Sequence, residues 1–533
     1  MIDNMSSQAR MVLALVLSFA FFIAYEYFMI PQKSPYAGQE INGTTTVAKQ
    51  AGMVAPNDTT AAPVTASTTQ IAPVVAKQHA LITVVSSEKF RAEFDKLGRI
   101  TKYEVMHERY KDEEGNYPNL IADKSPLKPL EIRFSDAALN AEAFEVAYVP
   151  DKAALSVENG NEVLTLTQNL SATTITKKIT FHKDGSYQLN VSLSKDIPYF
   201  ISPGFRPDVA ADMYTFKGAL IRKSEGSIEM IGDGDAEGNE VFHGASIASA
   251  NDKYYTTSFY DFDNAMSVFI SKDAEEDPLV FVKGSSNFKT NGYIGAKEYD
   301  TMKAIDPRLT DVIEYGFFTF IAKPVFIFLK YIHGLLGNWG WSIIMITLII
   351  RFILYPLTYK GMVSMNKLKS LSPKIKELQK QHKGDPQKMN AKMMELYKKH
   401  GANPMGGCLP MIMQIPVFFA IYRVLLNSVE LKSSPWIGWI QDLSLMDPYF
   451  ILPVLMSASM FWQQSITPTN FTDPMQEKIM KFLPLIFMFF FLTFPAGLTL
   501  YWFINNLFSV AQQYYVNSIF AKQEKHKEKE EVS

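Results

Sequence analysis

The sequence predicts a polytopic α-helical membrane protein that carries a large all-β domain outside the membrane. Three observations support this fold class. Apolar runs of membrane-spanning length occur once near the N-terminus and five times after residue 340. The segment between them consists of short β-rich stretches separated by Gly, Asn and Asp turns. The 38 Phe, 25 Met and 25 Tyr residues concentrate towards the C-terminus, which is typical of membrane helices.

The N-terminal apolar run covers residues 11–30 and is long enough to span a bilayer. It ends in "YEYFMIPQ", which is not a signal-peptide cleavage site, so we expect residues 1–32 to be an uncleaved transmembrane anchor. Residues 33–80 are rich in Thr, Ala, Pro, Val and Gln and have few large apolar side chains. They cannot bury a core, and we expect a flexible linker.

Residues 81–305 are predicted to form the all-β domain. The stretch "ATTITKKITFHKDGSYQLNVSL" contains two β-rich runs around Asp184-Gly185, which predicts a hairpin. Every second residue from Tyr187 to Leu193 is apolar, as a half-buried strand requires. Roughly 220 residues of this pattern suit a large β-sandwich.

The C-terminal part of the chain contains the other membrane-spanning candidates. They are residues 341–359, 408–426, 448–466, 479–494 and 497–519. A further apolar run, residues 315–336, precedes them but is interrupted by Lys323, Pro324, Lys330 and His333.

Charge decides how these runs are oriented. Residues 360–404 hold eleven lysines and three acids, so this segment is predicted to be cytoplasmic. If residues 315–336 also crossed the membrane, the lysines would lie outside. We therefore expect an interfacial amphipathic helix within residues 306–338, six spans and cytoplasmic termini. The basic tail, residues 521–533, agrees with that orientation.

The last five spans are expected to form a core over residues 339–520, with a cytoplasmic helical hairpin at 361–404. Asp385 can cap the second arm, with Pro386 at its first position and Gly401 at its end. Apolar residues at helical spacing would pack the two arms together: Ile375 and Leu378 on the first, and Met389, Met393 and Leu396 on the second.

An arginine, Arg351, lies about halfway along the second span, roughly 15 Å from its start. A central arginine costs about 2.5–3.5 kcal/mol on insertion scales. Thr347, Tyr355 and Thr358 share its helical face. Gln414 in the third span could join this face.

The last span also has a polar stripe, made of Tyr501, Asn505, Ser509 and either Gln512 or Gln513. None of the five C-terminal spans contains Asp or Glu. We therefore expect Arg351 to lack a buried counter-ion and to face a hydrated cavity formed by three helices. The alternative is an arginine that snorkels or bonds carbonyl groups for structure alone.

Five blocks of sequence resemble the YidC/Oxa/Alb family of membrane-protein insertases, in the Gram-negative form with a large periplasmic domain. They are "RFILYPLTYKGMVSMNKLKSLSPKIKELQ", "NPMGGCLPMIMQIPVFFAIYRVL", "IQDLSLMDPYFILPVLM", "TDPMQEKIMKFLPLIFMFFFLTFPAGLTLYW" and "NNLFSVAQQ". Their order and spacing make the resemblance specific, and it extends over essentially the whole chain.

The resemblance implies a bacterial inner-membrane insertase that is not an enzyme and has no cofactor or metal. It implies a five-helix insertase core with a groove that receives client proteins, and a periplasmic β-supersandwich. Candidate groove residues are Arg351, Thr347, Tyr355, Gln414, Tyr501, Trp502, Asn505 and Ser509. Phe418 and Phe490 are candidates for the surface along which a client helix leaves. Trp502 departs from the family, which commonly has a tyrosine there.

The family also implies partners: nascent membrane proteins, the Sec translocon, the ribosome or the signal-recognition-particle receptor, and membrane lipids. Recognition of nucleic-acid sequence is not expected. Two other functions remain open from the residues alone. A solute transporter could use a polar cavity, although a proton-coupled one would usually need a carboxylate or histidine relay in the membrane. A membrane-anchored periplasmic carbohydrate-binding module would need only one span.

Overall fold

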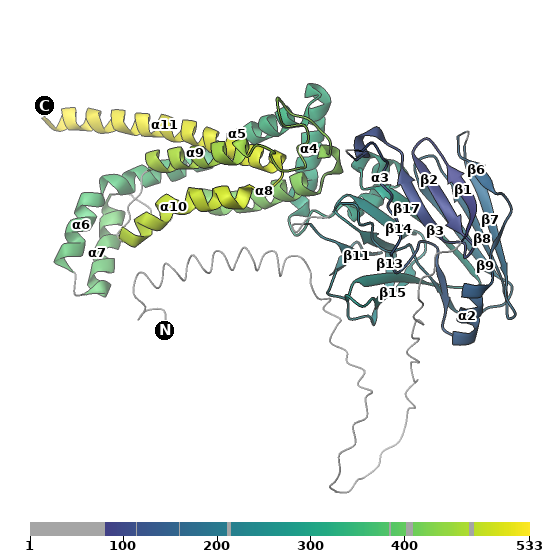
Figure 1. The fold of residues 1–533 in the computed structure, drawn as a ribbon. Helices are drawn as coiled ribbons and strands as arrows, with labels where there is room; N and C mark the ends of the chain where they lie inside the picture. Colours follow the sequence, from purple (N-terminus) through teal and green to yellow (C-terminus); the bar gives the residue numbers. More distant parts are fainter. Residues whose placement is uncertain are drawn as a thin grey trace, which may run out of the picture. The chain divides into compact units, whose positions relative to one another are not determined.

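The computed structural model describes residues 80–112, 114–158, 160–210, 215–382, 385–400, 409–467 and 474–532. The chain forms two compact units, a β unit that ends at Val312 and a helical unit that begins at Ile313 (Figure 1). The β unit extends past the expected end at residue 305 because the 3-10 helix η3 (Pro307–Val312) packs against helix α3 (Tyr299–Ile305). The predicted anchor lies outside the described residues.

The described residues of the β unit form two sheets. The smaller is four-stranded, in the order β3-β2-β1-β6. The larger is thirteen-stranded, along the path β4-β10-β16-β15-β13-β14-β17-β9-β8-β7-β5, with β11 paired to β13 and β12 paired to β11. The strands are β1 (Leu81–Ser86), β2 (Phe90–Asp95), β3 (Ile100–Val105), β4 (Ile132–Phe134), β5 (Val149–Pro150), β6 (Ala154–Ser156), β7 (Glu162–Asn169), β8 (Thr174–Phe181), β9 (Ser186–Leu193), β10 (Tyr199–Ile201), β11 (Gly218–Lys223), β12 (Ile228–Gly232), β13 (Glu240–Asn251), β14 (Tyr255–Tyr260), β15 (Met266–Lys272), β16 (Pro278–Gly284) and β17 (Asn287–Ala296). Helix α2 (Ala137–Glu145) and the 3-10 helix η2 (Glu108–Tyr110) lie in the connections.

Buried aromatic rings join the two sheets into a sandwich. Phe90 and Phe94 of β2 lie 6.1 and 6.2 Å from Phe181 of β8, measured between ring centroids. Phe90 also stacks on Tyr103 of β3 at 5.3 Å. These rings are almost completely buried, so the core of the β unit lies between the sheets.

The predicted hairpin around Asp184-Gly185 is confirmed by the pairing of β8 with β9. Gly185 has φ +90°, a conformation that favours glycine, and a Cβ there would lie 3.2 Å from the carbonyl oxygen of Ile294. The Asp184 carboxylate accepts a hydrogen bond from the backbone N–H of Ser186 at 2.9 Å. The turn residues therefore fit both the local geometry and the neighbouring strand.

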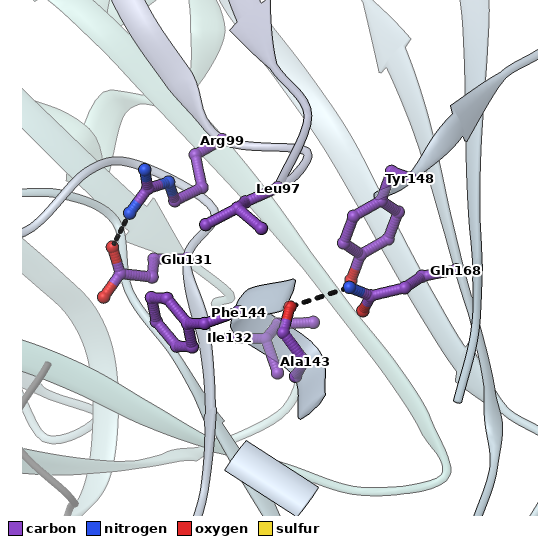
Figure 2. A pocket seen from close by; sticks show the side chains of 8 residues that line it. All are labelled: Leu97, Arg99, Glu131, Ile132, Ala143, Phe144, Tyr148 and Gln168. Carbon is purple, nitrogen blue, oxygen red and sulfur yellow. Dashed lines mark hydrogen bonds and ion pairs between the residues drawn. The ribbon is translucent and has the colours of Figure 1, made fainter. Parts of the chain in front are cut away.

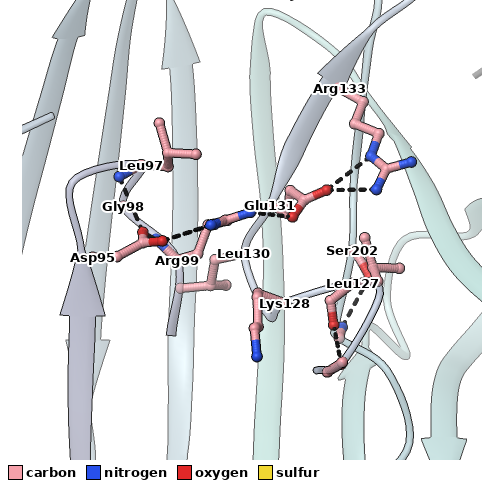
Figure 3. Close-up of polar contacts among 12 residues, drawn as sticks. Asp95, Leu97, Gly98, Arg99, Leu127, Lys128, Leu130, Glu131, Arg133 and Ser202 are labelled. Carbon is pink, nitrogen blue, oxygen red and sulfur yellow. Dashed lines mark hydrogen bonds and ion pairs between the residues drawn. The ribbon is translucent and has the colours of Figure 1, made fainter. Parts of the chain in front are cut away.

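A network of buried charges lies beside the smaller sheet (Figure 3). The Arg99 guanidinium contacts Asp95 at 2.7 Å and Glu131 at 2.8 Å, and Glu131 also pairs with Arg133 at 2.7 Å. Lys177 donates to the carbonyl oxygens of Gly98 at 3.0 Å and Leu130 at 2.8 Å. Burial lowers the pKa of Lys177 to about 7. The two arginines are matched by two carboxylates, which makes this a structural network.

The helical unit contains α4 (Thr319–Leu336), α5 (Trp339–Ser370), α6 (Ser372–Gln381), α7 (Pro386–Lys399), α8 (Leu409–Asn427), α9 (Ile451–Ile466), α10 (Pro474–Phe491) and α11 (Ala496–Val532), with the 3-10 helix η5 (Val429–Leu431). Helices α5, α8, α9, α10 and α11 correspond to the five predicted C-terminal runs, although α9 begins three residues after its run and α10 ends three residues before the end of its run. Two of them extend well beyond the run, because α5 continues to Ser370 and α11 continues through the basic tail.

Helices α6 and α7 form the predicted antiparallel hairpin. The Asp385 carboxylate accepts a hydrogen bond from the Lys388 N–H at 3.0 Å and caps α7. Ile375 of α6 packs in an apolar cluster with Met393, Leu396 and Tyr397 of α7, and Leu368 and Leu371 at the junction of α5 and α6 belong to the same cluster. Gly401, the expected end of the second arm, lies outside the described residues.

Helix α4 lies across the end of the helical bundle in Figure 1 rather than alongside the other helices. Phe318, just before α4, stacks on Phe419 of α8 at 6.1 Å, and His333 stacks on Trp339 at the start of α5 at 4.0 Å. By length and composition, α4 and α5 are the described helices that could cross a membrane, and Gln414–Asn427 is a shorter apolar helix. The number of spans therefore does not follow from helix length and hydropathy alone.

Candidate functional site

A polar centre lies inside the helical unit, where α5, α8 and α11 meet. Arg351 Nε donates to Asn505 Oδ1 at 2.7 Å, and Arg351 Nη2 donates to the Asn505 carbonyl oxygen at 3.2 Å. Gln414 Nε2 donates to the same Asn505 Oδ1 at 3.5 Å. We call Arg351, Gln414 and Asn505 the polar centre. Three helices thus contribute to one cluster, as the polar stripes predicted.

The polar centre faces inwards and apolar side chains face outwards. Arg351 is 6% exposed, whereas its neighbours Phe352 and Ile353 are 66% and 70% exposed. A helix in water would present the opposite pattern, with charges outside. The outer surface of α5 therefore suits lipid, and the arginine faces the bundle interior.

The partners of Arg351 are neutral. Within the part of the chain that the structure describes, Arg351 donates to the side chain and backbone of Asn505 and forms no salt bridge with a carboxylate. The Asn505 amide can accept from two donors but cannot cancel a positive charge. The field of Arg351 thus remains available to a third group.

Four other predicted residues lie on the same helix faces: two bond within their own helices, one is buried and one is half-buried. Thr347 donates to the Ile343 carbonyl oxygen at 2.6 Å, and Ser509 donates to that of Asn505 at 2.9 Å. Tyr501 is buried. Tyr355 is only half-buried, with its ring 5.8 Å from that of Tyr359.

Trp502 lies in an aromatic cluster rather than in the polar centre. Its ring centroid is 4.7 Å from that of Phe418, 5.2 Å from Phe491 and 6.0 Å from Phe487. Because Phe418 belongs to α8 and the other two belong to α10, Trp502 bridges these helices. Phe490 is more open, at 41% exposed, and contacts Phe494 at 4.8 Å. Phe418 and Phe490, predicted for the same surface, thus have different surroundings.

A second buried arginine, Arg423 on α8, is not among the site residues that the sequence patterns predicted. Its Nη1 lies 3.4 Å from the Glu314 carboxylate, and Asn427 donates to the Glu314 carbonyl oxygen at 2.7 Å. Glu314 precedes α4, so these contacts attach the start of α4 to α8. The signal available in the sequence was an arginine in an apolar run, the same signal that identified Arg351.

The β unit contains a small cavity of about 10 Å³ that offers a second candidate site (Figure 2). Arg99, Glu131, Tyr148 and Gln168 are among the residues that line it, and Gln168 Nε2 donates to the Ala143 carbonyl oxygen at 2.8 Å. A cavity of this size holds about one water molecule, whereas small-molecule pockets measure roughly 300–1,000 Å³. This cavity does not suit a sugar.

Comparisons with known proteins identify the family. Residues 331–524 match the family model described as 60Kd inner membrane protein, and residues 238–328 match the YidC periplasmic domain. A protein from Campylobacter jejuni named membrane protein insertase YidC is 53% identical over 98% of each chain. The chain belongs to the YidC family.

Two further YidC proteins agree with this assignment. The one from Wolinella succinogenes is 49% identical over 97% of this chain and 96% of its own. The one from Helicobacter pylori strain 26695 is 47% identical over 97% of each chain. The YidC membership confirms the predicted combination of a periplasmic β-sandwich domain with a helical core.

Proposed function

We propose that this YidC chain inserts client membrane proteins into the bacterial inner membrane, with its β unit in the periplasm. The relatives named as insertases match over nearly the full length, which is the observation that carries the proposal. Insertion makes and breaks no covalent bond, so the protein acts as a catalyst of transfer between phases rather than as a chemical enzyme.

The proposed topology has six spans and places both termini in the cytoplasm. The anchor would be the first span, and α5, α8, α9, α10 and α11 would be the others. The lysine-rich hairpin α6–α7 would be cytoplasmic by the positive-inside rule. Helix α4 would lie at the periplasmic interface, which agrees with its contacts at the C-terminal half of α8 and the first residue of α5.

The polar centre is the proposed receiving site for the hydrophilic part of a client. A buried arginine with neutral partners favours water and anionic groups in its surroundings. At an effective dielectric constant of about 20, two opposite charges 4 Å apart attract by about 4 kcal/mol. That attraction offsets part of the cost of removing an acidic tail from water, and it is modest enough to permit release.

The other candidate residues are proposed to assist the binding of the client at the polar centre. Thr347, Tyr501 and Ser509 extend the polar faces of α5 and α11, and Tyr355 lies further along α5. Phe490, on the open surface of α10, would contact the apolar client helix as it enters lipid. The Phe418–Trp502 pair would support that surface from inside through its aromatic packing.

The cytoplasmic hairpin is the proposed point of first contact with nascent membrane proteins. Its lysines would attract anionic lipid headgroups and ribosomal RNA through charge alone. The Sec translocon, the ribosome and the signal-recognition-particle receptor are the partners we propose from the family resemblance.

The proposal is tested by reconstituting the purified protein alone in liposomes and adding a small single-span client. We expect the client's outer tail to become protected from external protease at a rate well above that of empty liposomes. A dye-retention control excludes protection that results from leakage or a general solute pathway. Equal protection with and without the protein would contradict an autonomous insertase.

A further inference from the structure

Two adjacent glutamines on α11 differ in their hydrogen bonding. Gln512 and Gln513 are 5% and 4% exposed. Gln513 Nε2 donates to Asn517 Oδ1 at 2.7 Å, which also accepts from Asn366 Nδ2 at 3.0 Å. Neither amide atom of Gln512 has a hydrogen-bond partner among the residues that the structure describes. The two side chains have the same chemistry and nearly the same burial, so the difference lies in what each one faces.

Gln512 faces the bundle interior on the side of the polar centre. It follows Asn505 by seven residues, which is about two turns and roughly 10 Å along the helix. At 3.6 residues per turn, Asn505, Ser509 and Gln512 lie along one face. Between them, Phe508 contacts Phe352 of α5 at 5.2 Å, so this part of α11 packs against the helix that carries Arg351. Gln512 therefore lies two turns beyond Asn505, towards the proposed cytoplasmic side.

Gln513 points about 100° around α11 from Gln512, on the far side of Ser509, and is part of a structural link between helices. Asn517, its partner, donates to the Ile466 carbonyl oxygen at the end of α9 at 3.0 Å. Together with Asn366 of α5, these amides connect α5, α9 and α11. Gln513 thus contributes to packing, and its hydrogen-bonding capacity is used within the protein.

An unpaired buried amide destabilises the protein that contains it, because the group loses its bonds to water and gains none. The penalty disappears when a ligand supplies the missing partners. A primary amide offers two donors and one acceptor, which complement the C=O and N–H of a peptide group or the side chains of Ser, Asn and Gln. The chemistry of the site therefore fits an uncharged polar polypeptide segment.

We infer that Gln512 is a client-binding residue that pairs with uncharged polar groups of the translocating segment, on the cytoplasmic side of Arg351. This inference rests on the proposed insertase function. The two residues act on different parts of the client. Arg351 attracts acidic groups through its positive charge, whereas Gln512 forms hydrogen bonds with uncharged polar groups.

The test compares Gln512→Met with the matched control Gln513→Met in the full-length protein, because methionine has a similar length and lacks the amide. The client is a single-span protein whose outer tail is rich in Ser, Asn and Gln and has no charge. We expect Gln512→Met to slow its insertion by about two- to tenfold, the effect of losing one neutral hydrogen bond. The same variant should raise the thermal midpoint by about 2–4 °C, since a buried unpaired group is gone.

Gln513→Met should do the reverse: it lowers the thermal midpoint and leaves insertion per folded molecule within about twofold, because only an internal bond is lost. If Gln512→Met inserts this client as fast as the unaltered protein, the inference is overturned while the insertase function stands. If the unaltered protein itself fails to insert the client, the proposed function is what fails.

Direct contact is tested by disulfide crosslinking in a Cys408→Ser background. The client carries one cysteine in its tail and is halted by a folded domain at the tail's end. Gln512→Cys should crosslink to the halted client, and Tyr514→Cys should not, because Tyr514 is 51% exposed and contacts Trp462 of α9 on another face. No crosslink from position 512 at any tail position would overturn the inference.

Discussion

Arg99 in the β unit and Arg351 in the helical unit are both almost completely buried, at 2% and 6% exposed, yet their surroundings differ. Arg99 contacts the carboxylates of Asp95 and Glu131 at 2.7 and 2.8 Å. Among the described residues, Arg351 donates to two amide oxygens, the side-chain and backbone oxygens of Asn505. The first charge is neutralised by the protein, and the second is solvated without being neutralised.

The helical unit contains its own example of a neutralised arginine. Arg423 of α8 pairs with Glu314 at 3.4 Å, where it joins the segment before α4 to the bundle. Charge pairing is thus compatible with this bundle, and the absence of a described carboxylate at Arg351 is specific to the polar centre. The comparison indicates that buried arginines paired with carboxylates stabilise the fold. A buried arginine without a carboxylate partner keeps a positive electrostatic potential that can attract a ligand.

The largest effect is expected where a matched charge is removed. Arg99→Met should destabilise the β unit by about 3–5 kcal/mol, because Asp95 is left buried without a cationic partner and Glu131 keeps only Arg133. Arg91→Met is the matched control, since Arg91 pairs with Glu93 at the surface, and it should cost less than about 1 kcal/mol.

Urea unfolding of the full-length protein measures this difference, with pulse proteolysis as the probe for the β unit. All six tryptophans lie after residue 338, in the helical unit, so tryptophan emission serves as an internal control. The geometry implies that Arg99 neutralises buried carboxylates. Equal losses of unfolding free energy in the two variants would contradict this.

The second effect concerns the unmatched charge. Arg351→Ala should slow insertion of a client with an acidic tail by about tenfold or more, which corresponds to about 1.4 kcal/mol of lost attraction. Arg351→Lys should retain much of the activity, because charge and hydration persist. A client with the same tail neutralised should depend less on Arg351.

The insertion assay in liposomes gives these rates for both tails and all three proteins. Equal loss for both tails in Arg351→Ala would mean that the residue is structural. Equal loss in Arg351→Lys and Arg351→Ala would mean that guanidinium geometry matters more than charge.

The third effect is a pH dependence of the β unit. Burial lowers the pKa of Lys177 to about 7, whereas the unfolded chain titrates this group near its ordinary value of about 10.4. Between these values the unfolded state binds more protons, so stability rises with pH. The slope between pH 7.5 and 9.5 should approach about 1 kcal/mol per pH unit, and Lys177→Met should flatten it. Urea unfolding at several pH values measures both, and an unchanged slope in Lys177→Met would assign it to other groups.

The smallest effect on insertion is expected from deletion of most of the β unit. Removing residues 81–309 takes away the matched network and leaves the polar centre intact, so insertion by the purified protein should stay within about twofold. The deletion must retain Glu314 for Arg423, and Glu314→Gln in the full-length chain is a control that removes the negative charge from this contact. Lost insertion with unchanged tryptophan emission would show that the β unit takes part in insertion.

The sequence by itself determined the features that depend on local pattern. Apolar runs located the core helices, the Asp385-Pro386 pair located the start of α7, and Asp184-Gly185 located the β8–β9 hairpin. Each of these depends on residues within a few positions of one another, where helical or strand periodicity and capping chemistry act directly. The absence of acids in the C-terminal spans likewise predicted neutral surroundings for Arg351.

The tertiary structure decided which distant residues meet. Asn505 is 154 residues from Arg351, and Gln414 is 91 residues from Asn505, so only the packing of α5, α8 and α11 makes them partners. The same packing turns Trp502 towards the aromatic cluster, although it follows Tyr501 directly. It also separates Gln512 from Gln513, which the polar stripe could not distinguish. Helical periodicity gives the direction of a side chain to within a face, whereas a hydrogen bond requires the position of a neighbouring helix to within a few tenths of an ångström.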